Sequence, residues 1–562
     1  MVVKKCLSCV AWTVVLSAIL CATGCQPQLS AGDAKALAEA KAFLAAGGNV
    51  NAKAGDEMTR MRHAVWNGHL ETMRFLISKG TNLRERDHLG YHLLHTAALG
   101  GHVEAMELLI EHDAEVDVRS TAGYTALHVA AWEGSLDTVK LMVRLKADVN
   151  AKSTESKLTP LFFAAAAGSY EVADLLISRG ASATMSAIGG LRPLYLAAGG
   201  RDTICTNRDE IGFCVDPTVG EGGVLIRPRS WFRGNHEKAI RLLVKNGADV
   251  NRLHLGTTSL HKASGFGNVS AVKALLALGA DPLVRTGADV WGFWDRPGYN
   301  ALDYAVWNGI TSDREQGGML VGMLIRDGAK VNQHDGTGKT PLHHAVANLH
   351  IDATTVLLKA GANVNAVDKK FVSKIEASEI VPPSYRHNIG GPQFGQTPLF
   401  TALRVDVSRY WDKKLREQMQ AKRLAIVKLL LDKGADTAMQ LPNGASPLHI
   451  AVLFANSEEI VELLLANGAD IDATDNEQAT PLHYAVVRKP ATRSQKAIKP
   501  GLVRMFIRKG ACLTARTKGK KMTPLDWAVA TQRKHKQDLQ TDTTKEVIRI
   551  LKEALASQKQ NE

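Results

Sequence analysis

The chain has 562 residues, of which 45% are hydrophobic, 22% are charged and only 6% are aromatic. This balance excludes a disordered chain, and the length exceeds that of one compact domain. The apolar residues are largely Ala and Leu, a mixture that favours many small, closely packed helices over a β-sheet core.

The first residues have the pattern of a targeting segment. Lys4 and Lys5 precede a long run without charge, and this run ends in the sequence ATGC at positions 22–25. The ending resembles the lipobox of bacterial lipoproteins, although those proteins prefer Leu where Ala22 stands. The resemblance implies that residues 1–24 are a signal peptide. The alternative is an uncleaved membrane anchor, for which the uncharged run is barely long enough.

The same resemblance implies a lipid on Cys25 and a short tether over residues 25–32. Gln26, not Asp, follows the cysteine. In lipoproteins of Gram-negative bacteria this implies sorting to the outer membrane, facing the periplasm or the cell surface. Secretion is the alternative. No later segment of the sequence is apolar enough to span a bilayer.

The formal charge of +13 falls to +11 when residues 1–24 are removed, because these include two lysines and no acidic residue. A basic protein suits acidic partners, nucleic acid or anionic lipid. A chain exported from the cytoplasm rarely meets nucleic acid, so we expect no such partner. A solvated basic surface is the simpler interpretation of the charge.

Three cysteines remain beyond Cys25. Cys205 and Cys214 lie nine residues apart in an irregular stretch, and an oxidising compartment would permit a disulfide between them. Cys512 stands in an otherwise regular part of the sequence, where we expect a half-buried free thiol.

One hexapeptide recurs along the chain, and its first five copies start 33 or 34 residues apart. The copies are TRMRHA (59–64), HLLHTA (92–97), TALHVA (125–130), TPLFFA (159–164), RPLYLA (192–197), TSLHKA (258–263), NALDYA (300–305), TPLHHA (340–345), TPLFTA (397–402), SPLHIA (446–451), TPLHYA (480–485) and TPLDWA (523–528). This period and pattern resemble those of the ankyrin-repeat family. The resemblance implies a mainly α-helical solenoid of about twelve repeats, each a helix pair followed by a β-turn finger.

The rest of each repeat agrees with this interpretation. About 13 to 15 residues after the hexapeptide, an amphipathic run ends in Gly-Ala-Asp or a variant, as in IVELLLANGADIDA (460–473). The Gly should follow the second helix with a positive φ. Asp113 and Lys146 stand where this Gly is expected, so we expect both to adopt the left-handed conformation.

The first and fourth hexapeptide positions carry polar residues. Thr should cap the first helix, with Pro at its first turn. In ankyrin repeats the His bonds the Thr hydroxyl and the backbone across repeats, which implies a structural role for His128, His261, His343, His449 and His483. A metal or catalytic histidine set is the alternative. His343 and His344 are adjacent and should face different sides of a helix, which disfavours one shared ion.

The solenoid should cover residues 33–562, beginning with a partial capping repeat at 33–54. Breaks in the period predict insertions near 200–234, 284–299, 309–318, 367–396, 404–422 and 488–500. We interpret 200–234 as a loop pinned by the disulfide, with a degenerate repeat as the alternative. The polar segment 404–422 should extend helices beyond the stack.

Two insertions fall in fingers and carry aromatic residues. They hold Trp291, Phe293 and Trp294 in one finger and Tyr385 in the other. Exposed aromatic side chains in a protruding loop are typical anchors for a partner, so these four are the candidate partner-binding residues. The alternative is that the rings fold back and cover apolar surface of the solenoid.

These patterns predict a non-enzymatic scaffold or adaptor of the bacterial envelope, monomeric, without cofactor, that binds unidentified proteins. Residues 336–340 (GTGKT) resemble the end of a phosphate loop, but the required earlier Gly is Gln333. Two alternatives remain. One is a secreted effector that binds a host protein, and the other is a ligand-binding or enzymatic unit in 200–234.

Overall fold

The structure is a computed structural model that describes residues 30–53, 58–154, 156–199, 235–287, 298–307, 316–368, 395–405, 407, 412–455, 457–486, 500–534 and 541–561. The chain divides by its contacts into two units. The first comprises residues 1–197 and 201–248, and the second comprises 198–200 and 249–562. Each unit is described by itself below.

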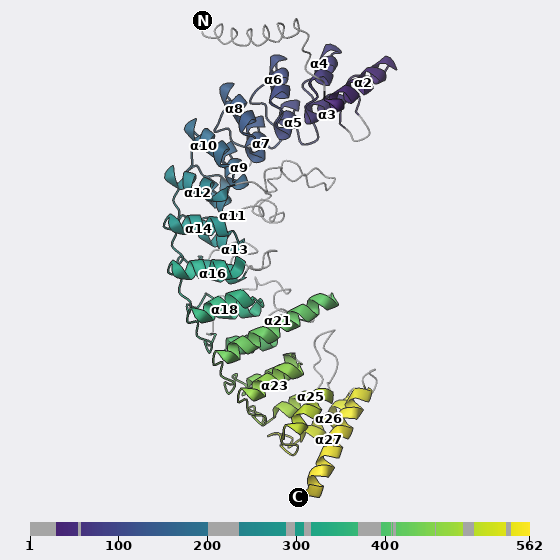
Figure 1. The fold of residues 1–562 in the computed structure, drawn as a ribbon, viewed down its shortest axis with the longest axis vertical. Helices are drawn as coiled ribbons and strands as arrows, with labels where there is room; N and C mark the ends of the chain where they lie inside the picture. The colour runs from purple at the N-terminus through teal and green to yellow at the C-terminus, as the bar shows by residue number, and fades with distance from the viewer. Residues whose placement is uncertain are drawn as a thin grey trace. The chain divides into compact units, whose positions relative to one another are not determined.

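The first unit consists of helices in two rows (Figure 1). Helices that begin in a hexapeptide form the row of first helices: α3 (Arg60–Asn67), α5 (Leu93–Gly100), α7 (Ala126–Glu133), α9 (Pro160–Ala167) and α11 (Pro193–Gly199), whose last residues belong to the second unit. The row of second helices contains α2 (Ala31–Ala45), α4 (Leu70–Ser78), α6 (Val103–Glu111), α8 (Leu136–Arg144), α10 (Tyr170–Ser178) and α12 (His236–Lys245). A short 3-10 turn, η1, covers Ile188–Gly190.

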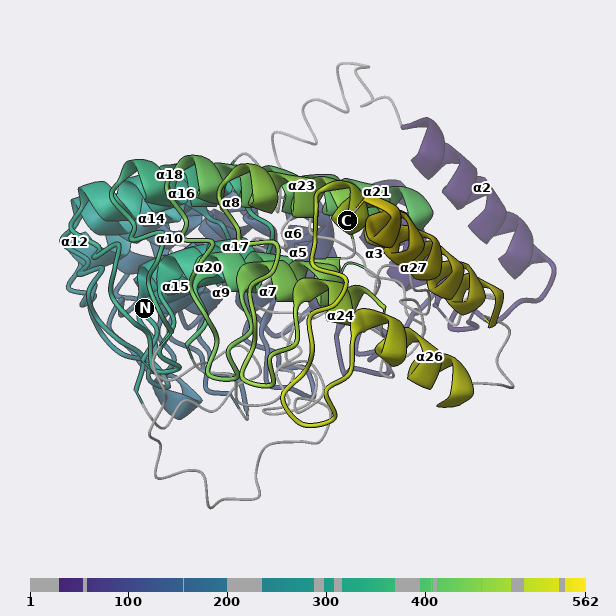
Figure 2. The ribbon, with the colours of Figure 1, turned by 90° about the horizontal axis from the view of Figure 1, so that it is seen from below.

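The second unit repeats this arrangement, and Figure 2 shows its two rows one above the other. The first helices are α13 (Ser259–Gly265), α15 (Ala301–Trp307), α17 (Pro341–Ala347), α20 (Pro398–Arg404), α22 (Pro447–Ile450) with the π-helical turn η6 (Ala451–Ala455), α24 (Pro481–Ala485) and α26 (Pro524–Lys534). The second helices are α14 (Val269–Ala277), α16 (Gln316–Arg326), α18 (Ile351–Lys359), α21 (Lys413–Asp432), α23 (Glu458–Ala466), α25 (Pro500–Arg508) and α27 (Thr541–Asn561).

All twelve hexapeptides open a first helix, so the helix pairs predicted from them are confirmed. Among the described residues there is no β-strand, and only three isolated bridges occur. The Leu and Ala of the hexapeptide fill the space between neighbouring repeats; Leu127 and Ala130, for example, have no exposed surface. Each helix pair therefore buries its apolar side against the pairs before and after it, as in other repeat proteins.

The capping interactions follow the expectation for the polar hexapeptide positions. The Nδ1 atom of His128 accepts a hydrogen bond from the Thr125 backbone N–H at 3.0 Å and lies 2.9 Å from its hydroxyl. Its Nε2 lies 3.1 Å from the carbonyl oxygen of Leu158, in the next repeat. Burial lowers the pKa of His128 to about 4, so the ring is neutral and both nitrogens are engaged in the scaffold.

The same bridge recurs at the other four predicted histidines. Their Nε2 atoms lie 2.9–3.1 Å from backbone carbonyl oxygens of a following segment: His261 from Val284, His343 from Gln396, His449 from Ala479 and His483 from Met522. These histidines are therefore structural.

The two departures from Gly at the end of the second helix behave as predicted. Asp113 has a φ of 65° and Lys146 a φ of 59°, against 77° for Gly80 at the corresponding position. The Lys146 N–H donates to the Val143 carbonyl, and the Ala147 N–H donates to the Met142 carbonyl, which closes the helix end in the usual way. Lys146 therefore keeps the turn at the expense of a strained backbone.

Two long helices differ from the regular pattern. α21 has 20 residues and its polar first half extends past α18 and α23 (Figure 1). Arg423 of α21 is only 1% exposed, and its guanidinium donates to the backbone oxygens of Val405 and Ala455, near the ends of α20 and η6. These bonds satisfy carbonyl groups that a helix end leaves without a partner. α27, the second, has 21 residues and packs on α25 and α26.

We predict that Lys146→Gly raises the free energy of unfolding by about 1 kcal/mol, because Gly adopts the left-handed conformation without the steric strain of a side chain. Thermal denaturation followed by circular dichroism measures the change. Lys79→Gly is the matched control, since Lys79 also ends a second helix but has a φ of −96°. A melting temperature that does not rise for Lys146→Gly, or rises equally for both variants, would contradict the prediction.

Candidate functional site

The candidate site residues from the sequence lie outside the described residues. This holds for the lipidation site Cys25, the cysteine pair Cys205 and Cys214, and the four aromatic residues Trp291, Phe293, Trp294 and Tyr385. The predictions for them stay predictions. Cys512 is described, and it is a free cysteine with an exposed side chain. The expectation of a half-buried thiol was wrong, because Ala511 is buried and the next side chain, that of Cys512, is exposed.

A groove in the first unit could serve as a binding site. Its volume is about 1070 Å³, and it lies between the first helices α3 and α5 and the fingers that accompany them. Its apolar lining comes from Met58, Trp66, Leu89, Leu99 and Val129. Polar lining residues include Asn51, Lys53, Asn67, Asn82, Arg86 and His88, all of which are exposed at the rim.

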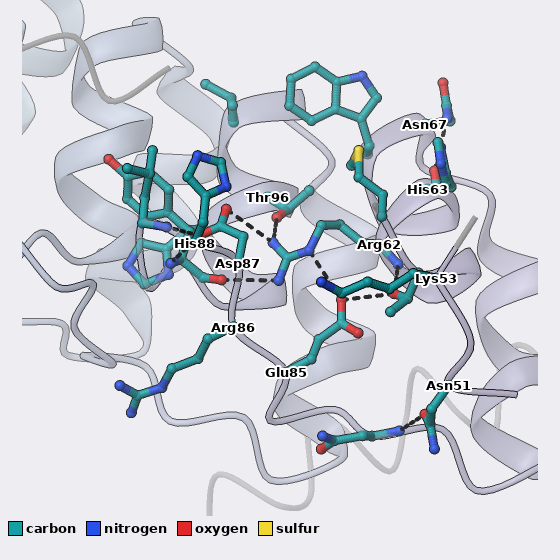
Figure 3. Close-up of a pocket in the computed structure, with 18 of the residues that line it drawn as sticks. Asn51, Lys53, Arg62, His63, Asn67, Glu85, Arg86, Asp87, His88 and Thr96 are labelled. Atoms are coloured by element: carbon teal, nitrogen blue, oxygen red, sulfur yellow. Dashed lines mark hydrogen bonds and ion pairs between the residues drawn. The ribbon is translucent and has the colours of Figure 1, made fainter. Parts of the chain in front are cut away.

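Arg62 forms the polar wall of this groove (Figure 3). It stands at the fourth position of the first hexapeptide, where six of the twelve copies have His, and its side chain is buried. One Nη atom donates to the Tyr91 carbonyl at 3.0 Å, which is the same contact across repeats that His95 makes 2.9 Å from the Tyr124 carbonyl. Arg62 therefore replaces the structural His and adds a positive charge.

The added charge is balanced by two carboxylates of the next finger. The Arg62 Nε lies 3.1 Å from a Glu85 oxygen, and an Nη atom lies 3.7 Å from an Asp87 oxygen. Thr59 donates its hydroxyl to Glu85 at 2.9 Å, and the second Nη of Arg62 donates to the Thr96 hydroxyl at 2.8 Å. This network holds the finger 81–91 against α3 and α5, so the groove has a defined shape before any partner arrives.

A second cluster of polar side chains lies in the second unit. Asp303 takes the fourth hexapeptide position there, is 1% exposed, and accepts the Asn300 N–H at 3.0 Å through one oxygen. Its other oxygen has no hydrogen-bond partner within the described part of the chain. Burial raises the pKa of Asp303 to about 8, and the nearby Asp335 carboxylate adds to the rise.

Asp335 behaves in the opposite way. Burial alone would raise its pKa, but hydrogen bonds from His344, at 2.7 Å, and from the Lys339 backbone lower the pKa to about 2. The Asp335 side chain also accepts the Thr337 N–H, so it organises the finger turn whose GTGKT sequence resembles a phosphate loop. These residues stabilise the repeat, and in the described ranges no group of three or more His, Cys, Asp and Glu side chains could hold a metal ion.

Comparisons with known proteins agree with the geometry. Family models described as ankyrin repeats match residues 61–153, 418–498, 133–177, 232–276 and 337–369. The chain contains ankyrin repeats. Repeats of this type suggest a protein–protein interaction scaffold, and the predicted solenoid of helix pairs is confirmed.

Individual relatives match only in part. The chain is 31% identical over 138 residues to the putative palmitoyltransferase ZDHHC13 of Danio rerio, which is 24% of this chain and 19% of that protein. The crystal structure of the human ASB11 ankyrin repeat domain is 20% identical, covers 49% of this chain and 99% of that one, and gives a TM-score of 0.36. Within the part of the chain that the structure describes, no helix combines the length and the apolar composition needed to cross a membrane.

The groove between α3 and α5 was not predicted from the sequence. A signal was present, because TRMRHA keeps only the Thr and the Ala of the T-P-L-H-x-A pattern and its helix lines the groove. Arg62 stands where other repeats have a structural His, so this repeat presents a different inner surface from that of the repeats with His.

We predict opposite pH effects for two carboxyl substitutions in the second unit. The folded protein keeps the Asp303 proton up to a pH of about 8, whereas the unfolded chain loses it near 4, so Asp303 lowers stability as pH rises through this window. Asp303→Asn should therefore raise the melting temperature more at a pH of about 8 than at about 5. Asp335→Asn should lower the melting temperature at neutral pH, because the low pKa of Asp335 means that its charged form stabilises the fold above a pH of about 4. Thermal melts of both variants across this range are the measurement, and an Asp303→Asn effect that does not change with pH would refute the assignment.

Proposed function

We propose that this chain is a non-enzymatic scaffold that binds other proteins, and that the groove of the first unit is a principal contact surface. The observation that carries the proposal is the combination of a preformed groove and a half-buried Trp66 in its lining. Tryptophan side chains that a partner can cover completely are among the residues that contribute most to protein–protein affinity.

The arrangement of the groove supports a peptide or loop as the occupant. Its apolar residues lie between polar side chains of the fingers, which is the distribution of an interface with a hydrophobic centre and a polar rim. The Arg62 network fixes the finger 81–91, so a partner would lose less conformational entropy of the scaffold on binding. A volume of about 1070 Å³ accommodates several side chains.

The insertions offer a second contact surface. Trp291, Phe293, Trp294 and Tyr385 remain our candidates there, on the grounds of their aromatic character and their position in fingers. A scaffold with two separate surfaces could hold two proteins, or two parts of one protein, at the same time.

We also propose that a lipid on Cys25 attaches the scaffold to the outer membrane of a bacterium, as the lipobox-like sequence ATGC suggests. The residues after the cysteine would serve as a tether. Such attachment would keep the repeats close to envelope partners and raise their effective concentration.

We predict that Trp66→Ala reduces crosslinking to envelope partners about tenfold without unfolding the chain, since a central aromatic anchor contributes more than 1 kcal/mol to binding. The measurement is crosslinking of the tagged full chain in its native envelope, followed by mass spectrometry. Tyr170→Ala is the matched control, because Tyr170 is a half-buried aromatic residue of α10 and does not line the groove. A double variant, Trp291→Ala with Trp294→Ala, tests the second proposed contact surface in the same assay. Equal crosslinking by Trp66→Ala and wild type would remove the groove from the proposal.

We predict that Cys25→Ser abolishes incorporation of labelled palmitate and releases the chain from the membrane fraction. Loss of a diacyl anchor removes the apolar surface that holds a lipoprotein in the bilayer. Cys512→Ser is the control, because Cys512 is a free and exposed thiol elsewhere in the chain. Label that persists in Cys25→Ser would show that the cysteine is not the lipid site, and unlabelled wild type in the culture medium would favour secretion.

A further inference from the structure

Four exposed cations occupy the same position in four consecutive fingers of the first unit. They are Lys53, Arg86, Arg119 and Lys152, and they are spaced 33 residues apart along the sequence. Each follows by six residues the left-handed residue that ends a second helix, namely Gly47, Gly80, Asp113 and Lys146. The equal register places these side chains in one row, which we name the basic column.

The basic column does not continue in the same way beyond the fourth finger. Six residues after the glycine of the next finger stands Ser186. In the second unit the equivalent residues are mixed in character: Leu253, Arg285, His334, Val367, Gln440, Thr474 and Arg516. An uninterrupted run of cations is therefore a property of the first four fingers and not of the repeat as such.

Hydrogen bonds between neighbouring fingers hold the column in place. The Asn51 side chain accepts the Asn82 N–H at 2.7 Å, and the Thr121 N–H donates to the Leu89 carbonyl at 3.2 Å. Arg119 itself donates through one Nη to the Lys152 carbonyl at 2.7 Å and to the Gly123 carbonyl at 3.4 Å. The spacing of the charges is thus set by the stack of repeats.

The carboxylates nearest the column bond to groups other than its cations. Glu85 and Asp87 lie beside Arg86 in sequence, but both are engaged by the buried Arg62 (Figure 3). Asp117, two residues before Arg119, accepts the backbone N–H of Asp148 at 3.2 Å. Burial raises the pKa of Asp117, and the Arg119 charge opposes this rise. In the described part of the chain, the four cations of the column therefore form no direct ion pair with these carboxylates.

We propose that the basic column binds an extended acidic segment of a partner protein, with carboxylates at every third residue. This deepens the proposed function and depends on it. Stacked helix pairs repeat at roughly 8–10 Å. An extended segment in the polyproline II conformation has three residues per turn and rises about 9 Å per turn, so every third side chain lies on one face and meets the next finger. Lys53 and Arg86 also line the groove, so the end of the same segment would enter it.

A membrane surface carrying anionic lipid is the competing partner for a row of cations. The position of the column disfavours it, because two of its four members face a groove that a flat bilayer cannot enter. An extended peptide can follow both the row and the groove.

The test uses the full chain and two synthetic peptides of identical composition. One carries Glu at every third position with a terminal Phe, and the other carries the same glutamates in two blocks. We expect the spaced peptide to bind about fivefold more tightly than the blocked one, and to lose several-fold of its affinity when NaCl is raised from about 50 to about 200 mM. Equal affinity for both peptides would overturn the proposal, since charge alone and not register would then explain the binding.

The matched variants separate the column from general positive charge. Replacement of Lys53, Arg86, Arg119 and Lys152 by Gln should weaken the spaced peptide about tenfold. Replacement of Lys79, Arg84, Lys140 and Arg179 by Gln removes the same charge from exposed positions outside the column and should change the affinity less than twofold. Equal losses in both variants would overturn the assignment of the column.

Vesicles containing phosphatidylglycerol provide the last arm. Column-dependent binding to these vesicles, without binding of the spaced peptide, would overturn the proposal in favour of a membrane contact. The crosslinking assay with Trp66→Ala keeps the two proposals apart. If crosslinking to partners depends on Trp66 but the column variant binds the spaced peptide as wild type does, the scaffold proposal is supported and the acidic-segment proposal is wrong.

Discussion

The contact that the rest of the structure depends on is the bridge from the fourth hexapeptide residue to the backbone of the following repeat. His128 makes it to Leu158 and His343 makes it to Gln396, in each case with a ring that also caps its own helix. One buried side chain thus fixes a helix start and the distance to the next helix pair. Each pair buries its apolar side only on its neighbours, and this His contact, present at six of the twelve hexapeptides, fixes the spacing between the repeats that it joins.

The fold could be predicted from the sequence because its information is local and repeated. The hexapeptides located all twelve first helices, and the period placed Asp113 and Lys146 at left-handed positions that the structure confirms. For Asp113 and Lys146, the position in the repeat was sufficient to predict a positive φ, a conformation that is strained for a residue with a side chain. The same rule could not reveal the exposure of Cys512, which depends on how a finger turns relative to its helices.

The candidate groove could not be predicted because it depends on contacts between residues distant in sequence. Arg62 meets Glu85 and Asp87 from another repeat, and only this meeting explains how a cation replaces a structural His. Asp303 illustrates the same point, since the acid at this position has a raised pKa when buried in α15, whereas Asp526, at the same position of α26, is exposed and has a lowered pKa through its bonds to Thr523. The hexapeptide motif therefore predicts that this Asp caps its helix, whereas the burial of the carboxyl determines whether it is charged.

A stack of repeats separates the residues that build the fold from those that recognise a partner. Most hexapeptide residues are buried between repeats, whereas finger residues such as Lys53 and Arg86 are exposed. Departures from the pattern therefore mark places where a repeat does more than support its neighbours. The divergent hexapeptide TRMRHA lines the groove, and the basic column begins beside it, so the first repeats combine a groove with a row of cations. Because the stack of repeats fixes the distance between neighbouring cations, a partner must place its carboxylates at the same spacing. Specificity for the partner then depends on the positions of its charges more than on their number.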